Sequence, residues 1–468
     1  MGDQPLVALH WLALVQHELL LFAGVFFLIG AIDEVLVDFM WFRLKLSGRT
    51  TLRIATEGLR HRRLRGRAAV LIPAWREERV IGHTIAHALS VWPQSGLRLY
   101  IGCYRNDPAT VQAAIDASGN DPRLRVVLLD QCGPTSKAGC LNRLYAAMEL
   151  DERRSGERVR MVLLHDAEDM VDPVALALLD QAIADAEFVQ LPVLPHPQSD
   201  SRWIGSHYCE EFAESHGKAM VVRSALATGL PAAGVGCAFA RDILGAMTRE
   251  PGAMGPFAEG SLTEDYEMGL RVAALGGRSR FLRVRGEDGR LVATRAFFPS
   301  TIDSAVTQKA RWIHGIAFQA WDRLGWTGGA GEFWMRLRDR RGPLGALVLS
   351  SGYLLLILTT LSAVLVAIGI GRAWQPSGVL PVLLWLNFIS FAWRAAMRFG
   401  FTAREYGALE GIRAVLRIPV TNVIAIMAGR RALFAYGRTL RGAAPHWDKT
   451  THDRHPAITL RAVPQSAR

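Results

Sequence analysis

The chain has 468 residues, of which 50% are hydrophobic and 21% are charged, and its formal net charge is +11. This mixture excludes both a pure bundle of membrane helices and an ordinary soluble enzyme, and the length allows one large catalytic core with accessory elements. Arg clusters beside apolar segments are typical of a cytoplasmic membrane face, so the positive charge does not require a nucleic-acid partner, and we expect none.

The first predicted element is a transmembrane helix within residues 1–42. Its apolar runs, Trp11–Val15 and Leu19–Ile32, are together long enough to cross about 30 Å of hydrocarbon. No Lys or Arg lies in the first ten residues and no small-residue cleavage site follows, which favours an anchor over a cleaved signal peptide. Acidic residues flank the run and are expected at an interface or against another helix: Glu18, Asp33, Glu34 and Asp38. The basic linker 43–67 places the exit of the helix in the cytoplasm.

From Ala68 to about Phe298, short β-rich runs alternate with helical stretches. Strands are predicted at 68–72, 97–103, 124–129 and 161–165, and a helix at 85–91. This alternation predicts an α/β domain with a parallel sheet and helical crossovers. Polar clusters follow three of the strands: Pro73–Glu78, Tyr104–Asp107 and Asp166–Asp172. Because ligands bind beyond the carboxyl ends of parallel strands, this placement indicates an enzyme.

Lys137 follows Gly133-Pro-Thr-Ser, which superficially resembles a phosphate-binding loop. However, the spacing GxxxxGK[ST] is absent and no GxGxxG occurs, so ATPase and dinucleotide-binding functions lose support. There is no nucleophile elbow, and the five cysteines have neither CxxC pairing nor zinc-site spacing. Scattered single thiols fit a reducing cytosol.

Asp166 and Glu168 lie one residue apart directly after a predicted buried strand. Two such carboxylates can face one hard cation and one diphosphate, and Mg²⁺ or Mn²⁺ prefers these oxygen ligands. The alternative is a solvated acidic turn before a helix that starts near Pro173.

Glu264 and Asp265 belong to the triplet Thr263-Glu-Asp265, which precedes a helical run at 266–275. A carboxylate there can act as a general base that removes the proton of an acceptor hydroxyl. It can equally be a simple helix N-cap, and the triplet alone does not choose between the two.

Gln308, Arg311 and Trp312 are spaced i, i+3 and i+4, so they are expected on one helix face. An Arg fork can hold a diphosphate, and an indole beside it can stack on a sugar ring. The alternative is a basic amphipathic helix that lies on a membrane surface.

A second apolar region forms a predicted transmembrane hairpin within residues 343–404. Its runs, 345–370 and 379–393, are flanked on both sides by arginines, which places both ends in the cytoplasm. Ile412–Ala428 is also apolar but contains Arg413 and Arg417, and as a further span it would export the arginines that follow. We therefore expect three spans, with an interfacial helix and a basic cytoplasmic tail in residues 405–468.

In their order and context these motifs resemble glycosyltransferase family 2, whose members are inverting enzymes with the GT-A fold. The resemblance covers roughly Ala68–Trp321, and we place the catalytic domain at 68–330. The motifs that match are Pro73–Glu77, Asp107, Lys137–Asn142, Asp166–Glu168, Thr263–Asp265 and Gln308–Trp312.

This resemblance implies a GT-A type, Rossmann-like domain that binds a nucleotide-sugar, joined to transmembrane helices. Asp265 would be the base with Glu264 beside it, and Asp166 and Glu168 would address Mg²⁺ or Mn²⁺. The family usually has DxD where this chain has Asp-Ala-Glu. The implied substrate-binding residues are Pro73, Glu77, Asp107, Lys137, Asn142, Gln308, Arg311 and Trp312.

Within family 2, the chain is most similar to the bacteriophage adsorption protein B family of inner-membrane proteins. The shared features are Asp33-Glu34 with Asp38, Tyr104–Asp107, His165–Asp169 and Trp447–Thr450. Larger members carry a C-terminal regulatory domain that binds cyclic di-GMP, which we expect to be missing from this chain.

The resulting expectation is a multi-pass protein of the bacterial inner membrane with a cytoplasmic catalytic domain. It would move a sugar, with inversion, from a nucleotide-sugar to a glycan or lipid-linked acceptor in exopolysaccharide or cell-envelope glycan synthesis. Expected partners are these substrates, the lipid bilayer, and an outer-membrane or export component. The alternative is a non-catalytic membrane scaffold or phage-adsorption receptor component that retains the fold.

Overall fold

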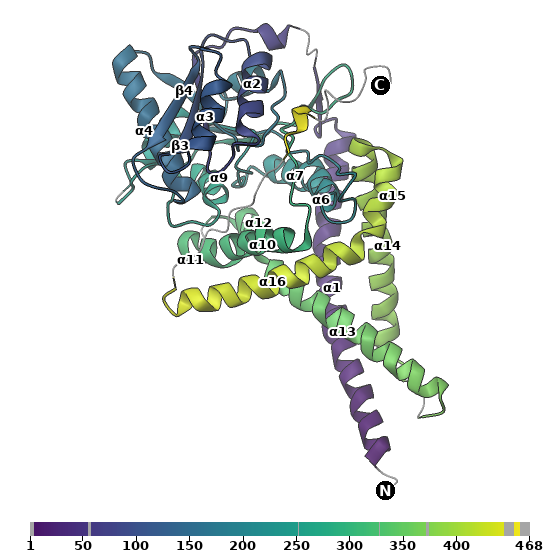
Figure 1. The fold of residues 1–468 in the computed structure, drawn as a ribbon. Helices are drawn as coiled ribbons and strands as arrows, with labels where there is room; N and C mark the ends of the chain where they lie inside the picture. Colours follow the sequence, from purple (N-terminus) through teal and green to yellow (C-terminus); the bar gives the residue numbers. More distant parts are fainter. Residues whose placement is uncertain are drawn as a thin grey trace.

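The computed structural model describes residues 4–54, 58–250, 252–326, 328–370, 374–443 and 454–458. The predicted motif Trp447–Thr450 lies outside these residues. An α/β domain occupies one end of the molecule, and long helices extend away from it toward the N-terminus (Figure 1). This arrangement matches the prediction of an α/β domain joined to membrane helices.

The described residues of the α/β domain form a seven-stranded sheet with the order β4-β3-β2-β5-β7-β6-β8. Strands β2 to β5 run parallel, and β7 is antiparallel to both of its neighbours. All four predicted strands are confirmed within two residues at each end. The strands are β1 (Leu52–Arg53), β2 (Arg67–Pro73), β3 (Leu97–Tyr104), β4 (Leu124–Leu129), β5 (Val159–Leu164), β6 (Phe188–Gln190), β7 (Cys237–Ala240), β8 (Ser279–Phe281) and β9 (Val284–Arg285), the last paired with β1.

The central strand β2 shows why this sequence forms a sheet that is covered on both faces. Successive side chains of a strand point to opposite faces. Val70 and Ile72 therefore pack into one apolar core, and Ala69 and Leu71 into a second. An all-apolar run without polar alternation is typical of a parallel strand buried on both sides. Pro73 ends the strand, and it cannot donate a backbone hydrogen bond.

Helices cover both faces of the sheet and build the junction with the membrane helices (Figure 1). The helices of the α/β domain are η1 (Leu59–His61), α2 (Ile81–Val91), α3 (Pro108–Asp116), α4 (Lys137–Ser155), α5 (Ala175–Ala182), α6 (His207–Glu214), η2 (Ser215–Ala219), α7 (Met220–Ala225), α8 (Arg241–Met247) and α9 (Glu264–Ala274). The helices that follow it are α10 (Ile302–Ile313), η3 (His314–Gln319), α11 (Ala320–Leu324), α12 (Ala330–Arg340) and α15 (Ala408–Leu416).

In the described part of the chain, four helices are long and apolar enough to cross a membrane: α1 (Gln4–Leu46), α13 (Gly342–Ala367), α14 (Leu380–Tyr406) and α16 (Ile418–Leu440). This is one more than the three predicted spans. The apolar segment at 412–428 is divided between α15 and α16, and α16 continues to Leu440, which gives it 23 residues. Figure 1 shows α16 running across α1, α13 and α14 rather than along them, and it packs against α10 and α13. An interfacial position of α16 stays a prediction.

Acidic residues of α1 lie against other helices, as the sequence predicts. Asp33 and Glu34 both pair with Arg338 and Arg341 at the end of α12. Asp38 pairs with the buried Lys218 of η2 at 2.5 Å. Because a buried charge without a partner costs several kcal/mol, these pairs hold α1 in one position against the α/β domain.

Candidate active site

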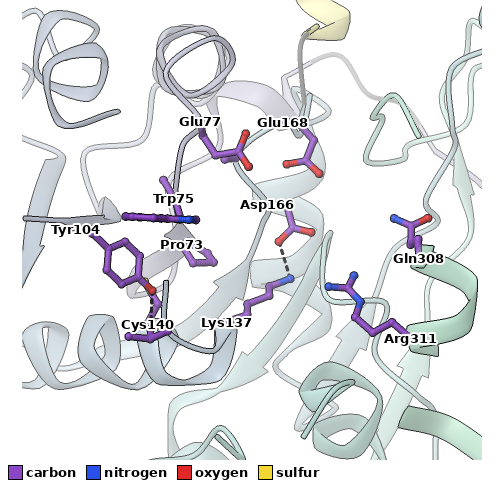
Figure 2. A pocket seen from close by; sticks show the side chains of 13 residues that line it. Pro73, Trp75, Glu77, Tyr104, Lys137, Cys140, Asp166, Glu168, Gln308 and Arg311 are labelled. Atoms are coloured by element: carbon purple, nitrogen blue, oxygen red, sulfur yellow. Dashed lines mark hydrogen bonds and ion pairs between the residues drawn. The ribbon is translucent and has the colours of Figure 1, made fainter. Parts of the chain in front are cut away.

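A pocket lies beyond the carboxyl ends of β2, β3 and β5 and is closed on its far side by α10 (Figure 2). Parallel strands end at the same edge of a sheet, so residues far apart in the sequence meet there. The residues that line it are Pro73, Ala74, Trp75, Glu77, Tyr104, Thr135, Lys137, Cys140, Asp166, Ala167, Glu168, Gln308 and Arg311. Seven of the predicted site residues are among them.

The turn after β5 aims Asp166 and Glu168 into this pocket. Asp169, which is buried, holds the turn because its Oδ2 accepts a hydrogen bond from the backbone N–H of Asp166 at 2.9 Å. The same oxygen lies 2.9 Å from Nδ1 of His165. Burial raises the pKa of Asp169, and the contact with His165 opposes that rise. Asp169 therefore shapes the turn but does not line the pocket.

Lys137 is the cation at the centre of the site. It begins α4, and its Nζ lies 2.5 Å from Oδ1 of Asp166, the contact drawn in Figure 2. Burial alone would lower the pKa of Lys137, but the carboxylates of Asp166, Glu264 and Asp265 raise it above its ordinary value. Lys137 thus stays charged in contact with Asp166, and it feels the charges of Glu264 and Asp265, which do not themselves line the pocket.

Glu264 and Asp265 occupy the first turn of α9, and Thr263 takes the N-cap position without a side-chain capping bond. Burial, followed by the charge of Asp265, raises the pKa of Glu264 to about 7. Burial also raises the pKa of Asp265, although Lys137 opposes this. Gly234 has a positive φ, and any Cβ there would collide with the carboxylate of Asp265. The backbone therefore approaches Asp265 as closely as only glycine allows.

The residue after the predicted base is tied to α12, the helix that precedes the long apolar helix α13. The Tyr266 hydroxyl donates to Oδ2 of Asp339 on α12 at 2.8 Å, and Arg223 donates to both oxygens of the same carboxylate. The backbone N–H of Tyr266 in turn donates to Oδ1 of Asp265 at 2.7 Å. A chain of hydrogen bonds thus connects Asp265 with the end of α12, where the neighbouring Arg338 pairs with α1.

Gln308 and Arg311 point into the pocket from α10, opposite Lys137 and Asp166 (Figure 2). Trp312 does not line the pocket, which corrects the expectation that these three residues share one site. Its ring lies 6.2 Å from that of Tyr208 and 6.5 Å from that of Phe212. The reason is the helical turn of about 100° per residue, which separates the directions of Arg311 and Trp312. A role for Trp312 with the acceptor stays a prediction.

Asp107 and Asn142 support the pocket from behind and do not line it. Asp107 accepts hydrogen bonds from the backbone N–H groups of Thr110, at the start of α3, and of Arg76. Arg76 has a φ of 53°, a left-handed conformation that costs of order 1–3 kcal/mol for a residue other than glycine. Asp107 therefore stabilises the strained turn that presents Glu77. Asn142 bonds both backbone polar groups of Phe257 at 2.9 and 3.0 Å. Direct contact of either residue with a nucleotide stays a prediction.

Six residues that line the pocket have no role predicted from the sequence: Ala74, Trp75, Tyr104, Thr135, Cys140 and Ala167. The rings of Trp75 and Tyr104 meet edge to face with centroids 5.1 Å apart, and the Tyr104 hydroxyl lies 2.7 Å from Oγ1 of Thr135. Burial raises the pKa of the Cys140 thiol to about 12, so it stays neutral and is a poor nucleophile. Trp75 follows β2 and Tyr104 ends β3, so the position of these aromatic residues at strand ends is the sequence pattern from which their place in the pocket could have been predicted.

The carboxylates of the pocket fit a divalent cation that is shared with a bound phosphate group. Within the described ranges, no cluster of three or more His, Cys, Asp or Glu side chains could enclose a metal by itself. Asp166 and Glu168 nevertheless line one pocket together. Mg²⁺ commonly takes one or two carboxylates and completes its shell with water and substrate phosphates, and Mn²⁺ accepts the same oxygen ligands.

Three comparisons place this chain among known proteins. Residues 66–315, more than half of the chain, match the model of a family described as "Glycosyltransferase like family 2". Bacteriophage adsorption protein B of Escherichia coli (strain K12) is 33% identical over 420 residues, as is Bacteriophage N4 adsorption protein B of Escherichia coli O157:H7. Each alignment covers 84% of this chain and 55% of the relative. The chain thus spans about half the length of the curated relatives it matches.

A solved structure shows the same fold at low sequence identity. The mannosyltransferase PcManGT from Pyrobaculum calidifontis, solved with GDP-Man and Mn²⁺, aligns with a TM-score of 0.51 and 14% identity. The alignment covers 88% of this chain and 99% of the mannosyltransferase. The predicted fold class, a GT-A type domain with additional membrane-type helices, is confirmed.

Proposed function

This chain belongs to the glycosyltransferase-like family 2, and we propose that it transfers a sugar from a nucleotide-sugar to a glycan or lipid-linked acceptor, with inversion. The observation that carries this proposal is the convergence of Lys137, Arg311, Asp166 and Glu168 on one pocket. Two cations and two carboxylates around one cavity match a diphosphate with a divalent ion. A scaffold that only retains the fold has no need for this arrangement.

The pocket offers a different surface to each part of a nucleotide-sugar. The rings of Trp75 and Tyr104 provide an apolar wall for the nucleobase of the donor. Arg311 presents a planar fork that can donate two parallel hydrogen bonds to a phosphate, with Gln308 beside it. Asp166 and Glu168 would hold Mg²⁺ or Mn²⁺, which supplies positive charge to the leaving diphosphate when bound. Lys137, whose Nζ lies beside Asp166, adds a further positive charge on the same side of the pocket, opposite Arg311.

Asp265 is the base of the proposed reaction. The oxygen of an acceptor hydroxyl attacks the anomeric carbon, the bond from that carbon to the diphosphate breaks, and the hydroxyl proton passes to Asp265. Attack opposite to the leaving group inverts the anomeric centre. The raised pKa of Asp265 suits this role, because a base is most effective when its pKa lies near the working pH. Tyr266 and Asp339 keep its carboxylate in place.

The membrane-type helices support a reaction at the bacterial inner membrane, with the α/β domain in the cytoplasm. Arginines gather at the α12–α13 junction and along the second half of α14, which is the pattern of a cytoplasmic face. The relatives are named for phage adsorption, which fits a product in the cell envelope. An outer-membrane or export partner would follow from such a product.

The test compares two substitutions in purified full-length protein supplied with nucleotide-sugars and Mn²⁺. Asp166→Ala should weaken donor binding and remove its dependence on divalent ions. Asp265→Asn should keep donor binding and lower turnover by roughly two to four orders of magnitude, the scale of general-base loss. Equal loss of donor affinity in both variants would show that the roles are wrongly assigned. If no nucleotide-sugar is bound or consumed, the scaffold alternative is favoured.

A further inference from the structure

A large apolar chamber lies among α1, α13, α14 and α16, apart from the catalytic pocket. Its volume is about 840 Å³, within the range of pockets that enclose whole small molecules. Its walls are mostly apolar and include Phe26, Phe27, Leu344, Val348, Leu349 and Phe391. The four helices are those long and apolar enough to cross a membrane, so the chamber would open within or beside the hydrocarbon layer.

One end of this chamber is charged, and its more exposed charges are cationic. Arg338, Arg341 and Arg394 line this end together with Asp33 and Glu34. The side chains of Arg341 and Arg394 are 42% and 33% exposed, whereas that of Glu34 is 13% exposed. Asp33 and Glu34 pair with these guanidinium groups and orient them. An occupant therefore meets donors that suit a phosphate.

Two glycines keep the chamber open. Gly30 of α1 and Gly345 of α13 both line it, and a Cβ at either position would have no heavy atom within 4 Å. Glycine in the middle of a helix costs roughly 0.5–1 kcal/mol relative to alanine, which applies to Gly30 in the interior of α1, whereas Gly345 lies in the first turn of α13. Both residues leave free space at this wall of the chamber.

The charged end of the chamber lies next to the catalytic pocket. Gly342 lines the chamber, and a Cβ on it would lie 3.4 Å from Ile313 of α10. Arg311, which lines the catalytic pocket, precedes Ile313 by two residues, a rise of about 3 Å along the helix. Two residues along a helix point about 200° apart, so Arg311 and Ile313 face opposite sides of α10, and this one helix separates the two sites.

We propose that this chamber binds the hydrocarbon chain of a lipid-linked acceptor, with the lipid phosphate at Arg341 and Arg394. The inference rests on the proposed function and names its acceptor class. The chain of the lipid would lie between the helices, and its glycan would extend past α10 to Asp265. There the terminal hydroxyl oxygen forms the new bond to the anomeric carbon, the nucleoside diphosphate leaves, and Asp265 receives the proton.

The test fills the chamber without touching the catalytic pocket. Gly345→Leu and, from the opposite wall, Gly30→Leu place a side chain in the free space. Gly400→Leu is the matched control, because Gly400 lies in α14, also has no atom within 4 Å of a Cβ, and is not part of the chamber. Donor hydrolysis by water and transfer to a polyisoprenyl-diphosphate-linked sugar are measured for each full-length variant.

Leucine at 345 or 30 should raise the acceptor KM about tenfold or more, because it displaces methylene groups of the bound chain. The donor KM and donor hydrolysis should stay unchanged, and Gly400→Leu should match the unsubstituted protein. An unchanged acceptor KM in both chamber variants, with donor hydrolysis intact, would overturn this inference alone. If the unsubstituted protein hydrolyses no nucleotide-sugar donor and transfers no sugar, the proposed function itself is overturned instead.

A photoreactive polyisoprenyl phosphate provides a readout that needs no turnover. It should label α1 or α13 of the unsubstituted protein and of Gly400→Leu, and should label Gly345→Leu weakly. A phospholipid with the same photoreactive group is the second arm. If it labels the chamber equally well and competes at equal concentration, the chamber holds bulk membrane lipid only and the inference is wrong.

Discussion

Replacing Glu264 by glutamine tests the electrostatics of the site most directly. Glu264 is 5% exposed, and its pKa rises from the ordinary 4.5 to about 7, chiefly through burial and then through Asp265. A carboxyl whose pKa is raised in the folded state favours folding below its unfolded pKa, and this contribution is lost as the pH rises through the folded pKa. At about 1.4 kcal/mol per pKa unit, ionised Glu264 costs the folded protein about 3 kcal/mol at pH 8.

The amide of Glu264→Gln stays neutral at every pH, so the variant should be more stable at pH 8 and unchanged at pH 4. A gain of about 3 kcal/mol corresponds to a rise of about 3 °C in the melting temperature of a chain of 468 residues, because the unfolding entropy is about 2.1 cal/mol/K per residue. Thermal melting of the purified protein at both pH values measures this. Glu267→Gln is the control, because Glu267 is equally buried but accepts from Ser261 and pairs with Arg323; it should melt lower at pH 8. Equal melting of Glu264→Gln and the unsubstituted protein at pH 8 would refute the reasoning.

Three further outcomes are expected. Tyr266→Phe should lower turnover about fivefold, which corresponds to the loss of one hydrogen bond of about 1 kcal/mol, and should leave the donor KM unchanged. The control Tyr406→Phe removes a hydroxyl bonded to the Pro195 carbonyl and should change neither quantity. An equal fall in turnover in both variants would contradict a positioning role of Tyr266. Arg311→Lys should raise the donor KM about ten- to a hundredfold, since lysine cannot form two parallel hydrogen bonds, and an unchanged KM would argue against a diphosphate contact. A reporter fused at Gln375 should lie outside and one after Arg441 in the cytoplasm; a cytoplasmic signal at Gln375 would defeat the hairpin.

Local patterns predicted the strands and the motifs of the site well. Val70, Ile72 and their neighbours form a short apolar run that is typical of a buried strand, and Asp166 follows the end of another strand. Spacing along one helix was less reliable. Gln308 and Trp312 are four residues apart, yet only Gln308 lines the pocket. Gln308, Arg311 and Trp312 spread over about 100° around the helix, and the pocket contacts only part of that arc. The number of predicted membrane spans likewise depended on α16. Its length and hydropathy are those of a membrane span, whereas its arginines favour a position at the membrane interface.

The sequence by itself determined the four strands β2 to β5, the positions of the carboxylates at strand ends, and the family. These depend on periodicity and on short motifs, which are local. Only the tertiary structure decided that Lys137 pairs with Asp166, that Asp107 holds the turn before Glu77, and that Tyr266 bonds to Asp339 of α12. These contacts join residues 29 to 73 positions apart. Their geometry follows from packing, which no local pattern encodes.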